Sequence, residues 1–339
     1  MRDPQVTRRR ATSADVAREA GVSRATVSYV LNGNITQTIP EVTRAKVRAV
    51  AERLGYVVSA AGRALRTGRS KIVLMLVPDY PLPAAAEQGM RALTRFLEKR
   101  GLVLVIHHQT SAEGEASQRL WASIDPALVI VFDQMAGAPL DRLRQSGIDH
   151  IVTFTGRAGP EAQGLQIDES RIGRVQVEHL LACGRRRLAY AYSPDMRQRA
   201  FADLRLQGAR EACHALSASE LVTVVVPQDT SAAASVLRRL IADGLTGICA
   251  YDDDVALAVL AGAREAGISV PSTLAVVGVD DIPAAALAVP PLTTVAVDYT
   301  DIAEFVADGV ASIVLGTPAP GMRDTGRIRL VPRATTCQA

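Results

Sequence analysis

Short apolar runs alternate with amphipathic stretches along most of this 339-residue chain. The clearest runs are Ile72–Val77, Leu128–Phe132 and Leu188–Tyr192, each of which is bounded by loop residues. Short apolar runs that alternate with helical patterns predict parallel sheets joined by crossover helices. The other runs are Leu102–Ile106, Ile151–Phe154, Val222–Val226, Gly247–Ala250, Leu274–Val279 and Thr293–Val297, and candidate helices lie at Glu87–Arg100, Arg174–Cys183, Leu204–Leu216, Ala232–Ala242 and Val255–Ala266.

The number of these runs and the chain length both indicate more than one core. About nine strands are too many for one compact sheet of this type, and single cores seldom grow past about 250–300 residues. We therefore predict two doubly wound, parallel-sheet α/β subdomains.

The composition is that of a globular protein, with 48% apolar and 22% charged residues, which excludes a mainly disordered chain. No stretch approaches the roughly 20 apolar residues of a membrane span, and the basic segment Met1–Arg10 is not followed by an apolar one. We therefore expect a cytoplasmic protein with no membrane partner. The widely spaced Cys183, Cys213, Cys249 and Cys337 are predicted to be reduced, mostly buried thiols, neither a disulfide framework nor a zinc site.

Positive charge is concentrated at the N-terminus. Residues 1–71 hold 14 Lys+Arg against 5 Asp+Glu, whereas the remaining 268 residues hold 24 against 30. A small basic module on a larger acidic body is typical of a nucleic-acid-binding protein with a separate second function.

The basic segment has the pattern of a helix-turn-helix. Thr12 and Asp15 fit a capping box that starts one helix, and Gly21 suits the turn that ends it. Ser23 then caps a second helix, in which Val27, Val30 and Leu31 share the inner face. The outer face and N-terminal end of that helix therefore carry Arg24, Ala25, Ser28 and Tyr29.

A third helix is predicted after Pro40. Its apolar stripe is Val47, Val50, Ala51 and Leu54, and Gly55 ends it. Three such helices suit insertion of the second one into a DNA major groove. A generic three-helix module that binds another protein is the alternative.

The amino-acid sequence of the head resembles that of the DNA-binding head of LacI/GalR-type transcriptional repressors. The resemblance is carried by Asp15–Gly33 (DVAREAGVSRATVSYVLNG), by Thr43-Arg44, by Leu54-Gly55-Tyr56 and by Ala64–Arg69, and it continues through the body. It implies a helix-turn-helix head and a body like the type I periplasmic binding proteins, with a ligand cleft between two lobes. It also implies a homodimer that binds double-stranded operator DNA.

The resemblance assigns DNA contacts residue by residue. Arg24, Ala25, Ser28 and Tyr29 stand at positions that face base edges, and Ser23, Thr26 and Asn32 stand at phosphate-contacting positions. Arginine is the commonest reader of guanine and hydroxyl groups bind phosphate oxygens, so the residue types fit.

The segment 57–68 corresponds to the family's hinge. Leu65 matches a leucine that wedges into the minor groove, and Arg66 matches a neighbouring basic contact. Val57-Val58-Ser59 and Gly62 depart from the family pattern, and glycine inside a helix costs about 0.5–1 kcal/mol relative to alanine. We expect weaker coupling of hinge folding to DNA binding here; a plain flexible linker is the alternative.

Effector residues are expected at the carboxyl ends of the body's strands, where ligands of such sheets bind. Asp280 and Arg205 match family positions that hold a sugar hydroxyl or a polar ring edge. Asp252 stands where relatives usually have asparagine, and this exchange favours ligands that bear hydroxyl or amine groups over anions. The further candidates are Arg199, Tyr80 and Asp133.

Other polar residues at strand ends have plainer interpretations. Asp253, Asp254 and Asp281 are expected to cap helices, although an Asp cluster is also compatible with Mg²⁺. His107 and His108 have no Ser or Cys partner at recognisable spacing and are expected to be structural. We therefore expect no catalytic residue, no metal and no cofactor.

The domain prediction is a head over 1–56, a hinge over 57–68 and an effector-binding and dimerisation domain over 69–339. Its N-subdomain spans about 70–166 and 299–325, and its C-subdomain spans about 167–298 and 326–335. The predicted function is a regulator, specifically a repressor, controlled by a sugar-like effector. The alternatives are a purine- or nucleoside-responsive repressor and a solute-binding protein without a regulatory role. The absence of a leucine heptad tail favours a dimer over a tetramer.

Overall fold

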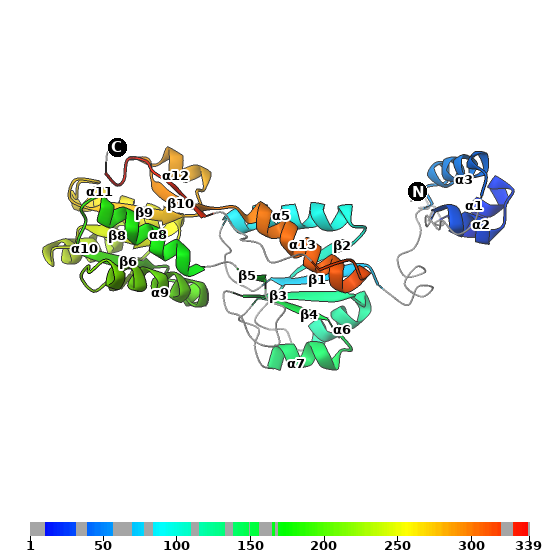
Figure 1. Cartoon of the computed structure of the whole chain (residues 1–339), viewed down its shortest axis with the longest axis horizontal. Coiled ribbons are helices and arrows are strands. Elements are labelled where there is room, and N and C mark those ends of the chain that lie inside the picture. The colour runs from blue at the N-terminus through cyan, green and yellow to red at the C-terminus, as the bar shows by residue number, and fades with distance from the viewer. Residues whose placement is uncertain are drawn as a thin grey trace, which may run out of the picture. The chain divides into compact units, whose positions relative to one another are not determined.

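The computed structural model describes residues 11–31, 39–56, 70–77, 84–109, 115–132, 138–148, 150–155, 165–166, 169–319 and 328–337. The chain divides into two compact units, a head within residues 1–71 and a body within residues 72–339. Figure 1 shows the elements of both units.

The described part of the head contains helices α1 (Ser13–Ala20), α2 (Arg24–Leu31) and α3 (Glu41–Arg53). The predicted capping box starts α1, because Asp15 N donates to Thr12 Oγ1 at 3.3 Å and Thr12 N donates to an Asp15 carboxylate oxygen at 2.9 Å. Gly21, with φ 67°, ends that helix. Thr26 N donates to Ser23 Oγ at 3.0 Å, so the predicted cap of α2 is confirmed.

The predicted apolar stripes of the three helices meet in one small core. Val16, Val27 and Val47 are almost fully enclosed in it. The other buried members are Ala17, Ala20, Val30, Val50 and Ala51, with Val22, Leu31, Ile39, Leu54 and Tyr56 packed at the edge. This core fixes the direction of α2 and leaves its opposite face to solvent.

The first lobe of the body, here the N-lobe, is built on a parallel sheet with the strand order β2–β1–β3–β4–β5. Alternate side chains of β1 enter different cores, with Val73, Met75 and Val77 on one face and Leu74 and Leu76 on the other. Helices α5 and α13 cover the first face and α6 and α7 cover the second (Figure 1). The bounds are β1 Ile72–Val77, β2 Val103–His108, β3 Leu128–Phe132, β4 Ile151–Thr155, β5 Leu165–Gln166, α5 Ala84–Lys99, α6 Glu115–Ile124, α7 Ala138–Gln145 and α13 Tyr299–Leu315.

The second lobe, here the C-lobe, has a sheet with the order β11–β10–β9–β8–β6–β7. Its strands are parallel except β11, which runs antiparallel to β10. All residues of β6, β8 and β9 are buried. The bounds are β6 Leu188–Tyr192, β7 Val222–Val225, β8 Gly247–Ala250, β9 Ala275–Val279, β10 Thr293–Val297, β11 Ile328–Val331, α8 Glu169–Ala182, α9 Arg199–Ala215, α10 Thr230–Ala242, α11 Asp253–Ala266 and α12 Pro283–Leu287.

The predicted fold class, a helical head with two parallel α/β subdomains, is confirmed. Two strands were not predicted from the sequence. β5 is only two residues long, and β11 is a partly exposed edge strand whose Arg329 interrupts the apolar pattern. Neither strand has the continuous apolar run by which the buried strands were recognised.

The prediction for the cysteines is wrong for one pair. Cys183, just after α8, is joined to Cys337 by a disulfide with a Cα–Cα distance of 5.3 Å. These residues are 154 positions apart, so no local spacing marks them as partners. Cys213 and Cys249 are buried free thiols, as predicted.

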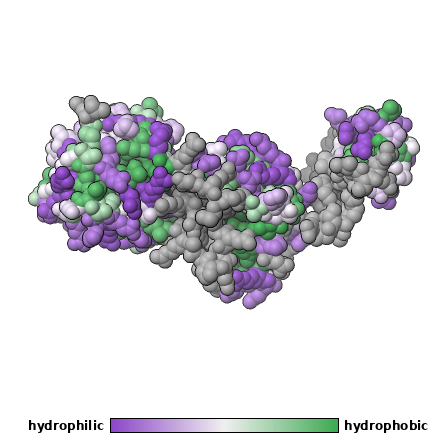
Figure 2. Space-filling view, viewed as in Figure 1, coloured by the Kyte–Doolittle hydropathy of each residue, from purple (hydrophilic) through white to green (hydrophobic). Residues whose placement is uncertain are grey.

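Among the described residues there is no candidate membrane-spanning helix. No helix there has the length and apolarity needed to cross a bilayer. On the face of the C-lobe drawn in Figure 2, hydrophilic residues are interspersed with smaller hydrophobic patches.

Candidate functional site

The first candidate site is the solvent-facing side of α2 in the head. Ser23, Arg24 and Ala25 are exposed, and Ser28 and Tyr29 are half-buried on the same helix. Thr26 lies within hydrogen-bond distance of Ser23, since the two hydroxyl oxygens are 2.9 Å apart. The N-terminal end of α2 therefore presents a guanidinium, a methyl group and two hydroxyls to solvent.

Arg24 differs from other arginines of the head. Arg18 pairs with Asp15 at 2.7 Å, and Arg53 pairs with Glu19 at 2.7 Å. Arg24 forms no ion pair with any residue in the described part of the chain. Its guanidinium is therefore available to an external acceptor.

Three predicted DNA contacts cannot be placed. Asn32, Leu65 and Arg66 lie outside the described residues, as do Gly62 and the rest of the hinge.

The second candidate site is a polar cluster in the C-lobe, centred on Arg205. This side chain is 2% exposed, and its Nε donates to Glu169 Oε2 at 2.6 Å. Its Nη1 donates to the Tyr251 carbonyl oxygen at 2.6 Å, and its guanidinium carbon lies 4.8 Å from the centre of the Tyr251 ring. Burial is the largest single influence and opposes the charged form, but Glu169, Tyr251, Asp280 and Tyr299 together outweigh it and raise the pKa of Arg205 well above its usual value. Arg205 is therefore a fixed cation inside the lobe.

Two glycines allow α8 and α9 to bring this pair together. A Cβ on Gly173 of α8 would lie 1.9 Å from the Arg205 carbonyl oxygen. A Cβ on Gly208 of α9 would lie 1.8 Å from the Ser170 carbonyl oxygen. The backbones touch at these points, and this contact sets Glu169, at the start of α8, beside Arg205.

Asp280 completes the cluster at the end of β9. Its φ is 101°, which a non-glycine residue seldom adopts. Its Oδ1 is buried and has no hydrogen-bond partner among the residues that the structure describes. Burial raises the pKa of Asp280 to about 7, although Arg205 opposes the shift. A strained, unsatisfied polar group of this kind is typical of a ligand-binding position.

Asp252 and Asp253 have different structural roles. Asp252 caps α11, because Val255 N donates to Asp252 Oδ1 at 2.8 Å, and burial raises its pKa. The expectation that Asp253 caps the helix is wrong. Asp253 instead accepts from Thr294 Oγ1 at 2.6 Å and from Ile282 N at 3.0 Å, and burial raises its pKa to about 7.

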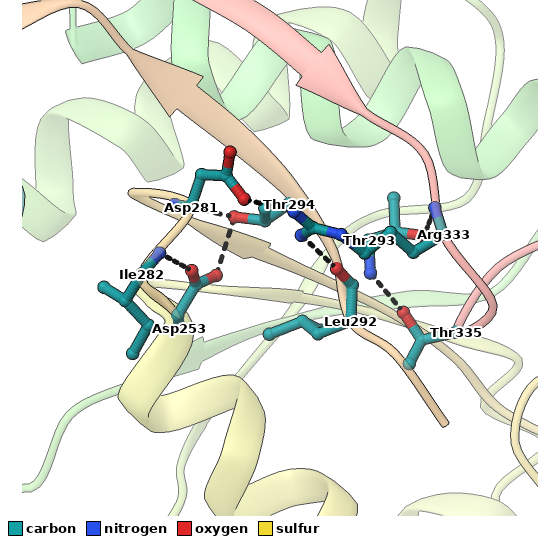
Figure 3. Close-up of polar contacts among 8 residues, drawn as sticks. All are labelled: Asp253, Asp281, Ile282, Leu292, Thr293, Thr294, Arg333 and Thr335. Carbon is teal, nitrogen blue, oxygen red and sulfur yellow. Dashed lines mark hydrogen bonds and ion pairs between the residues drawn. The ribbon is translucent and has the colours of Figure 1, made fainter. Parts of the chain in front are cut away.

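Asp281 does not cap a helix either. It accepts from Arg333 Nη2 at 2.6 Å, and its φ is 53°. Figure 3 shows Asp281, Asp253 and Ile282 around one turn, with Arg333 reaching it from the C-terminal segment. The turn that carries Asp280 is thus held from two sides.

The structure brings Arg205, Asp252 and Asp280 close enough to shift one another's pKa. Arg199 forms a cation–π contact and an ion pair instead. Its guanidinium carbon lies 3.8 Å from the centre of the Tyr192 ring, and its Nε is 3.3 Å from Asp203 Oδ1. Its role as a ligand-stacking residue stays a prediction. Tyr80 and Asp133 lie outside the described residues.

The sequence analysis missed three members of the cluster. Glu169 and Tyr251 hold Arg205, and the half-buried Tyr299 shifts the pKa of Arg205 from the start of α13. Tyr251 directly precedes the Asp252–Asp254 run, so its place beside that run was a usable signal. Nothing local marks Glu169 or Tyr299, since only the tertiary fold brings them to Arg205.

Comparisons with known proteins agree with this arrangement. A family model described as bacterial regulatory proteins, lacI family, matches residues 12–59, and one described as a periplasmic binding protein-like domain matches residues 177–336. The HTH-type transcriptional regulator CelR of Thermobifida fusca is 31% identical over 304 residues, which cover 85% of this chain and 87% of the relative.

Two solved structures share the fold over nearly the whole chain. The Lac repressor dimer bound to operator and the anti-inducer ONPF has a TM-score of 0.78 at 22% identity, and the match covers 96% of this chain and 99% of that one. A CelR–cellobiose complex has a TM-score of 0.66 at 26% identity and covers 96% of this chain and 100% of that one. The chain therefore belongs to the lacI family of bacterial regulatory proteins, which makes it a DNA-binding transcription regulator and confirms the prediction of a non-enzymatic protein.

Proposed function

We propose that the chain is a cytoplasmic repressor that binds a pseudo-palindromic operator as a homodimer and responds to a small, sugar-like effector in the cleft between the two lobes, where it meets the Arg205 cluster. The observation that carries the effector part is the buried, unsatisfied Asp280 carboxylate beside the fixed cation of Arg205. The dimer and the operator are supported by the fold match to a Lac repressor dimer on its operator.

The reading of DNA is assigned to α2. Arg24 is exposed and unpaired within the described residues, and a guanidinium can donate two parallel hydrogen bonds to guanine. Ser23 and Thr26 supply hydroxyls for phosphates, Ala25 a methyl for thymine, and Ser28 and Tyr29 further polar contacts. Asn32 as a phosphate contact and Leu65 and Arg66 as the minor-groove wedge complete the proposed interface.

Arg24→Ala tests this interface. A good bidentate contact is worth roughly 1–3 kcal/mol of discrimination, so we expect that loss at a single operator position, measured by binding to a library of singly substituted operators. Arg24→Lys is the matched control, since it keeps the charge but not the planar fork. Equal weakening on every sequence would reduce Arg24 to a phosphate contact.

The charge balance of the C-lobe cluster indicates the class of effector. Among the described residues, Arg205 is the cation of this cluster, and Glu169, Asp252 and Asp280 interact with its charge. Glu169 already satisfies its Nε. When Asp280 is ionised, its free oxygen requires a donor, which a hydroxyl or an amine provides and a fully ionised phosphate or carboxylate does not. When Asp280 is protonated, as its raised pKa allows near pH 7, a hydroxyl can also accept from it. A polyhydroxylated, uncharged ligand fits best, in keeping with the solved CelR–cellobiose complex to which this chain is similar.

A thermal-shift screen tests the effector class. Sugars, polyols, amino sugars, sugar phosphates and nucleobases are compared on the wild-type protein and on Asp280→Asn. A ligand that binds only the folded state stabilises it by about 2.7 kcal/mol at 100 times its Kd. We expect a hydroxyl-rich hit that Asp280→Asn loses; a hit among nucleobases would favour a purine-responsive repressor, and a hit retained by the variant would place the site elsewhere.

A further inference from the structure

The disulfide between Cys183 and Cys337 ties the C-terminal segment to the end of α8. Neither cysteine is fully buried. His179 lies one helical turn before Cys183, and its Nε2 is 3.7 Å from Cys183 Sγ and 2.9 Å from Thr336 Oγ1. The pair is therefore close to a possible proton acceptor and open to small reagents.

The disulfide anchors the segment 333–337, and hydrogen bonds join this segment to β9 and β10. Thr335 Oγ1 donates to the Val276 carbonyl oxygen at 2.7 Å and accepts from Thr293 N at 2.8 Å. Val276 N donates to the Thr335 carbonyl oxygen at 2.9 Å, and the hydroxyl oxygens of Thr336 and Thr293 are 3.0 Å apart. The segment is thus hydrogen-bonded to the beginnings of β9 and β10.

Arg333 connects this segment to the turn that holds Asp280. Its Nη2 donates to Asp281 Oδ1 at 2.6 Å, and its Nη1 donates to the Leu292 carbonyl oxygen at 2.9 Å (Figure 3). Asp281 directly follows Asp280, whose φ of 101° must be maintained by its neighbours. A contiguous set of contacts therefore runs from Cys337 to the candidate effector site.

We propose that Cys183 and Cys337 form a reversible thiol–disulfide pair, and that its oxidation state controls how firmly the C-terminal segment holds the Asp280–Asp281 turn. The oxidant is a low-molecular-weight disulfide. One cysteine thiolate attacks it and releases one thiol, and the second cysteine thiolate displaces the other thiol from the mixed disulfide. Two protons leave the protein, the Sγ–Sγ bond forms, and the two electrons remain on the released thiols.

The surroundings of Cys183 suit the first deprotonation. His179 Nε2 lies 3.7 Å from Cys183 Sγ, and burial lowers the pKa of His179, which favours the neutral ring that can accept the thiol proton. The other cysteines cannot take part in the same way, because Cys213 and Cys249 are buried and burial raises their pKa. The consequence for effector binding rests on the proposed function, whereas the thiol chemistry does not.

Thiol counting tests the pair. The full-length protein is equilibrated with glutathione buffers of decreasing reduced-to-oxidised ratio, quenched with acid, denatured and labelled with a maleimide of known mass. We expect a change from four labelled thiols to two. This loss of two thiols should disappear in Cys183→Ser and in Cys337→Ser, and persist in Cys213→Ser as a change from three to one. Four thiols in every buffer would overturn the proposal, and so would two thiols in every buffer. Stoichiometric zinc in the native protein before the quench would also overturn it, because His179, Cys183 and Cys337 would then be metal ligands.

Hydrogen exchange of the same samples, without effector, tests the mechanical link. Reduction is expected to speed exchange at least tenfold at the amides of Val276, Thr293 and Ile282, and to leave Ala127, in the N-lobe, unchanged. Arg333→Gln keeps the disulfide but removes the contact to Asp281, so exchange at Ile282 should become insensitive to reduction. Identical exchange in oxidised and reduced wild-type protein would refute control of the turn, whatever the fate of the effector assignment.

Discussion

Asp280 is costly for the stability of the fold, and it is also the residue on which the proposed effector site depends. Its carboxyl is enclosed, its backbone is strained, and no described neighbour satisfies its Oδ1. The obvious alternative target, Arg205, is less informative to mutate. Removing it leaves Glu169 buried without its partner, which typically costs about 3–5 kcal/mol and confuses loss of binding with loss of folding.

The free energy of unfolding should fall with rising pH because of Asp280. Its pKa is raised by burial from 3.8 to about 7, so the folded state keeps a proton that the unfolded state has lost. Its stabilising contribution is full below pH 4 and disappears as the pH rises towards 7. One pKa unit corresponds to about 1.4 kcal/mol, so the contribution is at most about 4 kcal/mol.

Asp280→Asn tests this by urea unfolding at a series of pH values. The variant should show a shallower decline between pH 4 and 7 than the wild type. A residual decline is expected from Asp253, whose pKa is also raised to about 7. Asp252 interacts with Asp280 and burial raises its pKa as well, so a wild-type curve that the substitution leaves unchanged would assign the titration to Asp252 or Asp253.

Single residues were predictable where the constraint is local. The Thr12–Asp15 capping box, the left-handed Gly21 and the Ser23 cap each depend on two or three neighbouring residues and could be inferred from the sequence. The role of Asp253 could not, because its partners Thr294 and Ile282 come from other elements. A sequence shows that a carboxylate follows a strand but not which element packs above it.

At the scale of elements, the contact of α8 with α9 determines the geometry of the C-lobe cluster. Gly208 lies where any side chain would meet the Ser170 backbone at 1.8 Å. Gly208→Ala must therefore separate the helices, and we expect it to lower the free energy of unfolding by about 1–3 kcal/mol or more. It should also weaken binding of any ligand found in the screen, because Arg205 and Glu169 move apart.

Gly309→Ala in α13 is the matched control for that substitution. A Cβ there meets nothing within 4 Å, so the helix should gain about 0.5–1 kcal/mol of stability. Denaturant midpoints and m-values of both variants are the measurement. A Gly208→Ala protein as stable as Gly309→Ala would contradict the close approach of the two backbones.

The strands and helices themselves were largely predictable because burial leaves an apolar pattern in the sequence. The small edge strands lack such a pattern and were not predicted. Buried strands such as β1, β3 and β6 coincide with continuous apolar runs, and their predicted bounds match the structure. The start of α8 was predicted late: the helix begins at Glu169, five residues before its first recognised position, Arg174. Polar first turns carry no apolar periodicity, so only caps can reveal them.

At the scale of the whole molecule, the uneven charge has a measurable consequence. Lys and Arg outnumber Asp and Glu by 9 in residues 1–71 and are outnumbered by 6 in the rest of the chain. The body therefore repels DNA at long range while the head attracts it, and ion release should dominate affinity. Each neutralised phosphate contributes roughly −0.9 to the slope of log affinity against log salt concentration.

A two-fold dimer doubles the number of phosphates contacted on a pseudo-palindromic operator. We expect a dimeric mass by light scattering, and a salt slope on the full operator about twice that on a duplex carrying one intact half-site. The slope should be almost unchanged in Arg24→Ala if that residue reads a base, since base contacts release few ions. Equal slopes on the full operator and the half-site would indicate that only one head engages DNA. A tetrameric mass would show that the body has a second interface between subunits. The assembly would then carry four DNA-binding heads rather than two.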